Sequence, residues 1–234
     1  MYQLNGKVRY SETDANGKLS YTALLNYFQD SSTLQSDEIG ATGKAFSEMK
    51  LAWVLSFWQV CIEKLPEISD DIVVSTWPYD TKNLFGMRNF CMHDANGNRL
   101  AYANSIWVLI DLETGRPIKI PAEVSAYYKD EPMLEMCYSE RKIAVPKEFE
   151  EKPPVPVQKY FIDTNQHVNN ANYVMVAQEY LPQEFEAKEI RVEYKKAAVL
   201  GDILYPRVTV VDQEVTVALV DESGKTYAVV LFIG

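Results

Sequence analysis

A six-residue motif occurs twice in this chain of 234 residues, as DANGKL at positions 14–19 and as DTNQHV at positions 163–168. The same register aligns Gln29 with Gln178 and Asp30 with Glu179. A single repeat of this spacing indicates the duplication of a whole domain and not a solenoid of short repeats. The two copies therefore constrain the fold more than any other feature of the sequence.

The first copy reads as one helix followed by strands. Ser20 is a suitable helix N-cap, and Leu24, Leu25, Phe28 and Leu34 follow at roughly helical spacing, up to a stop signal at Gly40 or Gly43. An Asn-Gly pair at 96–97 lies between two strand-like runs and predicts a hairpin. The predicted strands cover residues 53–65, 71–77, 85–93 and 100–112.

The second copy repeats this plan in a shorter form. A helix is predicted from Asn169 or Asn170 up to Pro182, and strands at 190–196, 203–211, 215–220 and 227–233. One helix followed by several antiparallel strands, twice over, is an α+β plan in which each sheet wraps around its helix. The charged stretch 147–154 ends in two prolines. We therefore predict an N-terminal domain at 1–143, a linker at 144–156 and a C-terminal domain at 157–234.

Composition narrows the functional class. The chain has 23 Lys and Arg against 33 Asp and Glu, a net charge of −10, which opposes non-specific binding to nucleic acid or to anionic membranes. Apolar runs such as 228–233 are far shorter than the roughly 18 residues of a membrane span. The N-terminus reads as neither a signal peptide nor a transit peptide, so we expect a cytoplasmic protein. Three cysteines and two histidines predict neither a disulfide framework nor a metal site, and no cofactor is expected.

Three polar residues of the second motif are candidates for catalysis: Asp163, Asn165 and His167. If the segment is extended, their alternate side chains share one face, just before a helix N-terminus with its free backbone N–H groups. A base, an orienting amide and oxyanion donors are what thioester hydrolysis requires. The alternative is that Asp and Asn only cap the helix and that the histidine is structural. The first copy has Lys18 in place of His167, so we interpret it as non-catalytic.

Several motifs, taken together, resemble the acyl-acyl carrier protein thioesterases of plant plastids and bacteria. The segments are YSETDANG at 10–17, AWVLSFWQVCIEKLP at 52–66, VVSTWPYD at 73–80, RNF at 88–90, IDLETGRPIKIP at 110–121 and DTNQHVNNANY at 163–173. The resemblance implies two tandem hotdog domains, with an acyl-chain pocket in the first and catalysis in the second. It implies hydrolysis of fatty acyl-acyl carrier protein to a free fatty acid, which ends fatty acid synthesis. The family's catalytic Asp, Asn and His fall on Asp163, Asn165 and His167.

The resemblance also has a departure. Plant members carry an acidic residue followed by Cys where this chain has Ala197 and Ala198. A cysteine nucleophile is thus ruled out at this position, and one expected carboxylate is missing. His167 would deprotonate water directly, although a covalent route through Asp163 is also chemically possible.

Further residues are expected to bind substrate or carrier. Trp53, Phe57 and Trp58 are candidates for the acyl chain, and Asn169 and Asn170 for the substrate near the second helix, although core filling would also explain the aromatic residues. The carrier protein is acidic, so its docking calls for a local basic patch, for which Arg191, Lys195 and Lys196 are candidates.

A homodimer is compatible with two fused hotdog domains. Three alternatives stay open: an acyl-coenzyme A thioesterase, a hydratase with an Asp and His pair, and a non-catalytic acyl-binding protein.

Overall fold

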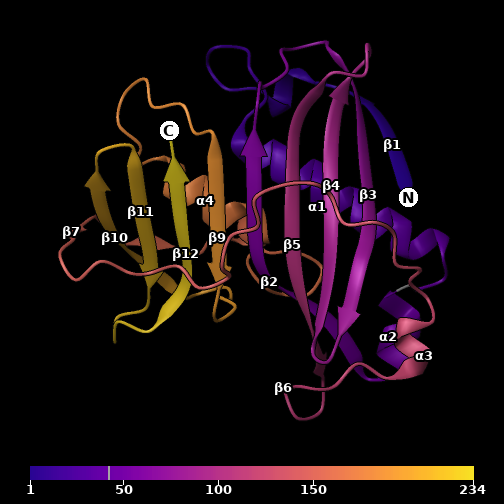
Figure 1. Cartoon of the computed structure of the whole chain (residues 1–234). Coiled ribbons are helices and arrows are strands. Elements are labelled where there is room, and N and C mark those ends of the chain that lie inside the picture. The colour runs from indigo at the N-terminus through magenta and orange to yellow at the C-terminus, as the bar shows by residue number, and fades with distance from the viewer. Residues whose placement is uncertain (42) are drawn as a thin grey trace. The chain divides into compact units, whose positions relative to one another are not determined.

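The computed structural model describes residues 1–41 and 43–234. They divide into two units: unit 1 comprises Met1–Ser56 and Ile62–Tyr138, and unit 2 comprises Phe57–Cys61 and Ser139–Gly234. Each unit combines an antiparallel sheet with one principal helix (Figure 1). None of the helices in these described residues is long and apolar enough to cross a membrane.

Unit 1 has its strands in the order β1-β3-β4-β5-β2, with the short β6 paired to β5. The hairpin predicted around the Asn-Gly pair joins β4 and β5, and the Asp94 carboxylate accepts hydrogen bonds from the amides of Asn96 (2.9 Å) and Asn98 (2.8 Å). The elements are β1 (Tyr2–Lys7), the 3-10 turn η1 (Tyr10–Glu12), α1 (Tyr21–Glu38), α2 (Gly43–Glu48), β2 (Leu51–Ile62), β3 (Asp71–Lys82), β4 (Phe85–Asp94), β5 (Arg99–Asp111), β6 (Arg116–Pro117) and α3 (Ala122–Ser125).

Helix α1 begins where the sequence predicts, because the Ser20 hydroxyl accepts a hydrogen bond from the amide of Ala23 (3.2 Å). Its buried face includes Phe28, whose ring lies 5.3 Å from the ring of Phe90 on β4. Leu34 points away from this face and is exposed, so the apolar stripe is shorter than the predicted helix. The contact of Phe28 with Phe90 anchors α1 to the sheet.

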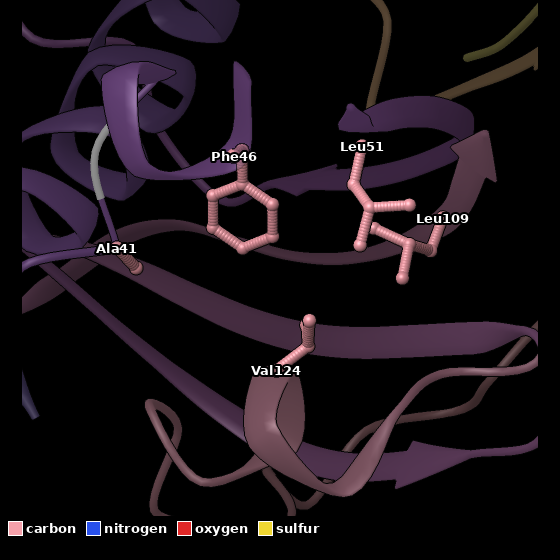
Figure 2. Packing of buried hydrophobic residues seen from close by; sticks show 5 residues of the cluster. All are labelled: Ala41, Phe46, Leu51, Leu109 and Val124. Carbon is pink, nitrogen blue, oxygen red and sulfur yellow. The ribbon is translucent and has the colours of Figure 1, made fainter. Parts of the chain in front are cut away.

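A second apolar cluster in unit 1 closes around α2 and α3 (Figure 2). Its five buried members, shown in the figure, come from both short helices, from β2 and β5, and from the segment between α1 and α2. They are Ala41, Phe46, Leu51, Leu109 and Val124. Partly buried aromatic residues, including Trp53 and Tyr128, pack against the cluster. This places Trp53 in contact with apolar side chains of unit 1.

Unit 2 has the strand order β9-β12-β11-β10-β7, and residues Phe57–Cys61 of β2 pair with β9. Helix α4 is shorter than predicted: it ends at Gln178, before Pro182. The elements are β7 (Glu150–Glu151), β8 (Val155–Pro156), the 3-10 turn η2 (Lys159–Phe161), α4 (Asn170–Gln178), β9 (Glu189–Tyr194), β10 (Ile203–Val211), β11 (Glu214–Val220) and β12 (Thr226–Ile233).

The stretch 144–156, which the sequence suggests as a linker, contributes to the sheet of unit 2. Both β7 and β8 pair with β10. The backbone carbonyl of Glu148 also accepts a hydrogen bond from the Thr209 hydroxyl (2.7 Å). Its prolines and charges suggest a loop by composition, but the free edge of β10 provides hydrogen-bonding partners for its backbone.

The duplication is repeated in the backbone hydrogen bonds. Several bonds join corresponding backbone atoms in the two copies at equal or nearly equal lengths. Examples at 2.9 Å are Val8 N to Asp70 O with Val157 N to Asp202 O, and Ser20 N to Glu12 O with Asn169 N to Phe161 O. The copies therefore share the local geometry that leads into their helices, and differences between them can be assigned to side chains.

Candidate functional site

Residues 163–167 form a tight turn just before α4. The amide of Asp163 donates to the carbonyl of His167 (2.8 Å), and the amide of Gln166 donates to the carbonyl of Asp163 (3.0 Å). Ile162 and Val168 pair as an isolated β-bridge on either side. The premise of an extended segment is therefore wrong, because Gln166 has a left-handed backbone (φ 63°) that folds the chain back.

The Asp163 carboxylate stabilises this turn. Its Oδ1 accepts hydrogen bonds from the amides of Asn165 (2.8 Å) and His167 (3.4 Å). Asp14 makes the same two bonds in the first copy, and Asp94 and Asp221 make them in hairpin turns. The arrangement is thus a general turn-forming device of this chain. It does not by itself distinguish a catalytic aspartate.

His167 is what sets the second turn apart. Its side chain is exposed, and within residues 1–41 and 43–234 its imidazole makes no hydrogen bond. Asn165 is also exposed on this turn. An imidazole can exchange protons near neutral pH, whereas the ammonium of Lys18 in the first copy is an ineffective base there. Of the two turns, therefore, only the second carries an imidazole, and its role as a general base stays a prediction.

Helix α4 starts directly after the turn. Asn169 is its N-cap: the side-chain Oδ1 accepts a hydrogen bond from the amide of Ala171 (2.9 Å). The carbonyl of Asn170 accepts a hydrogen bond from the Tyr194 hydroxyl (2.9 Å). Capping thus engages the Asn169 side chain, while substrate binding by Asn169 and Asn170 stays a prediction.

The segment with Ala197 and Ala198 lies beside the turn. Ala197 is exposed and Ala198 is fully buried. The Ala198 carbonyl accepts a hydrogen bond from the amide of Val168 (2.9 Å), and its own amide donates to the Tyr173 hydroxyl (2.8 Å). Sequence reasoning missed Tyr173; its place in the segment 163–173 was the only signal. No group of three or more His, Cys, Asp or Glu in the described part of the chain could hold a metal ion.

Comparison with known protein families shows to which family the chain belongs. Residues 1–128 match the family model of the acyl-ACP thioesterase N-terminal domain, and residues 145–227 match that of the C-terminal domain. The chain belongs to the acyl-ACP thioesterase family. His167 and its turn lie in the segment that matches the C-terminal model.

Two curated members of the acyl-ACP thioesterase family illustrate the similarity. A chloroplastic acyl-[acyl-carrier-protein] hydrolase of Cuphea viscosissima is 26% identical, over 97% of this chain and 57% of the relative. A chloroplastic palmitoyl-acyl carrier protein thioesterase of Arabidopsis thaliana is also 26% identical, over 87% of this chain and 54% of the relative. The chain thus spans about half the length of the curated relatives it matches.

Solved structures of the family confirm the predicted double hotdog fold. An acyl-ACP thioesterase from Bacteroides thetaiotaomicron superposes with a TM-score of 0.89 at 22% identity, covering 99% of this chain and 96% of the other. A 12:0-ACP thioesterase from Umbellularia californica gives a TM-score of 0.87 at 22% identity, with the same coverage. At this identity the comparison establishes the fold alone.

The predicted acyl contacts of this acyl-ACP thioesterase family member all lie on β2, and their contact with an acyl chain stays a prediction. Trp53 belongs to unit 1 and is partly buried, and its indole Nε1 has no acceptor among the described residues. Phe57 and Trp58 are grouped with unit 2 and are fully buried. Because they are consecutive in β2, they point to opposite faces of the sheet. Phe57 and Trp58 therefore cannot both line the same face of β2.

The candidate docking residues of this family member are all paired with acids. Arg191 pairs with Glu189, Lys195 with Glu193 (3.4 Å) and Lys196 with Asp221 (3.5 Å). Lys196 also lies over the ring of Tyr227, 4.6 Å from its centroid. Each pair offsets the positive charge that an acidic carrier protein would meet, so docking at these residues stays a prediction.

Proposed function

We propose that this protein hydrolyses the thioester of fatty acyl-acyl carrier protein, releases a free fatty acid and so ends fatty acid synthesis. One observation carries the proposal. The exposed His167, whose imidazole makes no hydrogen bond to the described residues, lies on the turn before α4 in the segment that matches the family's C-terminal domain, whereas the equivalent turn of the first copy carries Lys18.

Direct attack by water is the mechanism that the geometry supports best. His167 takes a proton from the water, and the exposed Asn165 on the same turn orients the water or the thioester. Asp163 presents both residues through the hydrogen bonds of its Oδ1. Backbone N–H groups at the start of α4 are the candidates for holding the oxyanion.

The alternative of a covalent intermediate on Asp163 has a direct test. The bonds of Asp163 to two backbone amides favour a role in holding the turn over a role as nucleophile. We expect single-turnover hydrolysis in heavy-oxygen water to label the fatty acid and to leave Asp163 unlabelled. Label in Asp163 would refute direct attack.

The remaining assignments rest on family membership. We propose that unit 1 binds the acyl chain, that unit 2 carries the chemistry and that the partner is acyl carrier protein loaded with a fatty acyl thioester. The cytoplasm is the proposed location. A homodimer is the proposed assembly.

Thiol release from a panel of acyl-acyl carrier proteins tests the proposal. We expect rapid release by the wild type and a loss of at least about 100-fold in kcat for His167→Ala, since general bases contribute roughly 10²–10⁴-fold. Lys18→Ala is the matched control and should retain full activity. Equal or faster release from acyl-coenzyme A would favour the coenzyme A alternative, and binding without release would favour an acyl-binding protein.

A further inference from the structure

The peptide of Ala198 is hydrogen-bonded on both sides within unit 2. Its amide donates to the Tyr173 hydroxyl (2.8 Å), and its carbonyl accepts from the amide of Val168 (2.9 Å). The exposed fractions of Tyr173, Ala198 and Val168 are 2%, 0% and 3%, so water cannot readily replace either bond. A buried donor or acceptor without a partner is costly, so both bonds are strongly favoured.

The first copy provides an internal comparison for this arrangement. The loop that follows β2 and the loop that follows β9 share two equivalent hydrogen bonds, which align the two loops. They are Leu19 N to Pro66 O (2.8 Å) with Val168 N to Ala198 O (2.9 Å), and Glu67 N to Asp70 Oδ2 (2.9 Å) with Val199 N to Asp202 Oδ2 (3.0 Å). Pro66 therefore occupies the place of Ala198.

The hydrogen bond from the Ala198 amide to the Tyr173 hydroxyl has no counterpart in the first copy. The register of the two motifs aligns Tyr173 with Leu24, which is fully buried and has no hydroxyl. Pro66, in the place of Ala198, has no N–H to donate. Both the donor and the acceptor thus occur only in the copy that carries a histidine on its turn.

We propose that Tyr173 is a positioning residue for His167, and that it acts through the peptide of Ala198 and not by touching the substrate. This inference rests on the proposed function. Val168 directly follows His167, and the His167 carbonyl accepts a hydrogen bond from the amide of Asp163 (2.8 Å). The backbone of the base is thereby held from both sides, and displacement of a catalytic group by about 1 Å can cost on the order of 100-fold in rate.

Tyr173 is itself held in place. Its ring meets the ring of Tyr194 edge-on, with centroids 5.7 Å apart, and the Tyr194 hydroxyl donates to the Asn170 carbonyl at the start of α4. Burial raises the pKa of Tyr173 to about 12, so its hydroxyl stays neutral. Plant members of the family carry Cys where this chain has Ala198. The alanine fits this role, because the two hydrogen bonds use only the backbone of Ala198 and need no thiol side chain.

The test is Tyr173→Phe, which removes the acceptor oxygen and keeps the ring. We expect kcat for acyl-acyl carrier protein to fall about 10-fold or more while KM changes by less than about 3-fold, because the lost bond positions the base and does not bind substrate. Hydrogen exchange at the Val168 amide should accelerate, while exchange at Leu19 should not. Tyr27→Phe is the matched control: it removes a buried hydroxyl bonded to Glu12 (2.8 Å) in unit 1, and should leave kcat unchanged.

A double-mutant cycle separates positioning from general damage. Ala198→Pro removes the donor of the same bond, so the double variant with Tyr173→Phe should be no slower than the slower single variant. Multiplied losses would overturn the inference, as would a Tyr173→Phe enzyme with kcat within about 2-fold of the wild type. If Ala198→Pro does not fold, the kcat and the hydrogen-exchange rates of Tyr173→Phe are sufficient to test the positioning role of Tyr173. No thiol release by the wild type from any substrate would instead overturn the proposed function, and this inference with it.

Discussion

Gln166 and Gly17 occupy the same turn position in the two copies, and both have a left-handed backbone, with φ of 63° and 76°. Glycine adopts this conformation without steric cost, whereas another residue loses roughly 1–2 kcal/mol. The turn that presents His167 is therefore strained relative to its counterpart.

Replacement of Gln166 by Gly should stabilise the protein. The gain of about 1–2 kcal/mol from relief of the left-handed conformation exceeds the roughly 0.5–1 kcal/mol of backbone entropy that glycine loses on folding. We expect the free energy of unfolding in urea to rise by about 0.5–1 kcal/mol. Gly17→Gln is the reciprocal control and should destabilise, although a Cβ at Gly17 would meet no atom within 4 Å. An unchanged or lower stability of Gln166→Gly would contradict the prediction.

Asn89 should be a large contributor to the stability of unit 1. It is fully buried, its Nδ2 donates to the Ala103 carbonyl (3.2 Å), and its Oδ1 accepts from the Leu134 amide and the Tyr138 hydroxyl, both at 3.0 Å. Asn89→Leu removes all three bonds and leaves the Ala103 carbonyl and the Leu134 amide without these side-chain partners, so we expect a loss of about 2–4 kcal/mol in urea unfolding. Proteolysis after Leu134 should accelerate as the segment detaches. The exposed Asn16→Ala should stay within about 0.5 kcal/mol of the wild type.

Cys91 should resist thiol reagents in the folded protein. Burial raises its pKa to about 11, so the thiolate that reacts is scarce at pH 8. We expect a chromogenic disulfide to label the exposed Cys137 first and Cys91 only after unfolding. Cys137→Ser serves as the control that assigns the fast phase. Fast labelling of Cys91 in the folded Cys137→Ser variant would contradict its burial.

The same thiol predicts a pH dependence of stability. The unfolded Cys91 loses its proton near the ordinary value of 9.0 and the folded one near 11. The folded state therefore binds more protons between these values, and stability falls as the pH rises from about 9 to 11. Unfolding in urea at both ends of this window should show a steeper loss for the wild type than for Cys91→Ala. Parallel losses in the two proteins would exclude a contribution of Cys91.

Trp53 should influence the choice of acyl chain if unit 1 binds the chain. A Cβ on Gly86 would lie 3.1 Å from Cη2 of the Trp53 indole, so Gly86→Ala displaces the ring, whereas Trp53→Ala removes it. We expect both variants to change the ratio of kcat/KM between long and short chains by about 10-fold or more, the effect of a methylene-sized change in a pocket. The exposed Val54→Ala is the neighbouring control. If the ratio of kcat/KM between long and short chains is unchanged in both variants, Trp53 does not line the acyl-chain pocket.

Local features were predictable because residues close in sequence decide them. The Ser20 cap of α1, the hairpin closed by Asp94 and the cap of α4 at Asn169 all depend on side chains within four positions of the backbone they bind. The duplication was readable for the same reason, since each copy repeats its local signals. The extended geometry assumed for 163–167 failed because the left-handed Gln166, which is not a glycine, gave no signal for a turn.

The sequence by itself therefore determined the duplicated α+β plan, the starts of both helices, and His167 as a difference between the two copies. Only the tertiary structure decided that Ala198 lies against Val168 and Tyr173, that β7 and β8 complete the sheet at β10 and that Lys196 is paired with Asp221. These contacts join residues more than twenty positions apart, and the packing of the whole sheet fixes them, which no local pattern of residues encodes.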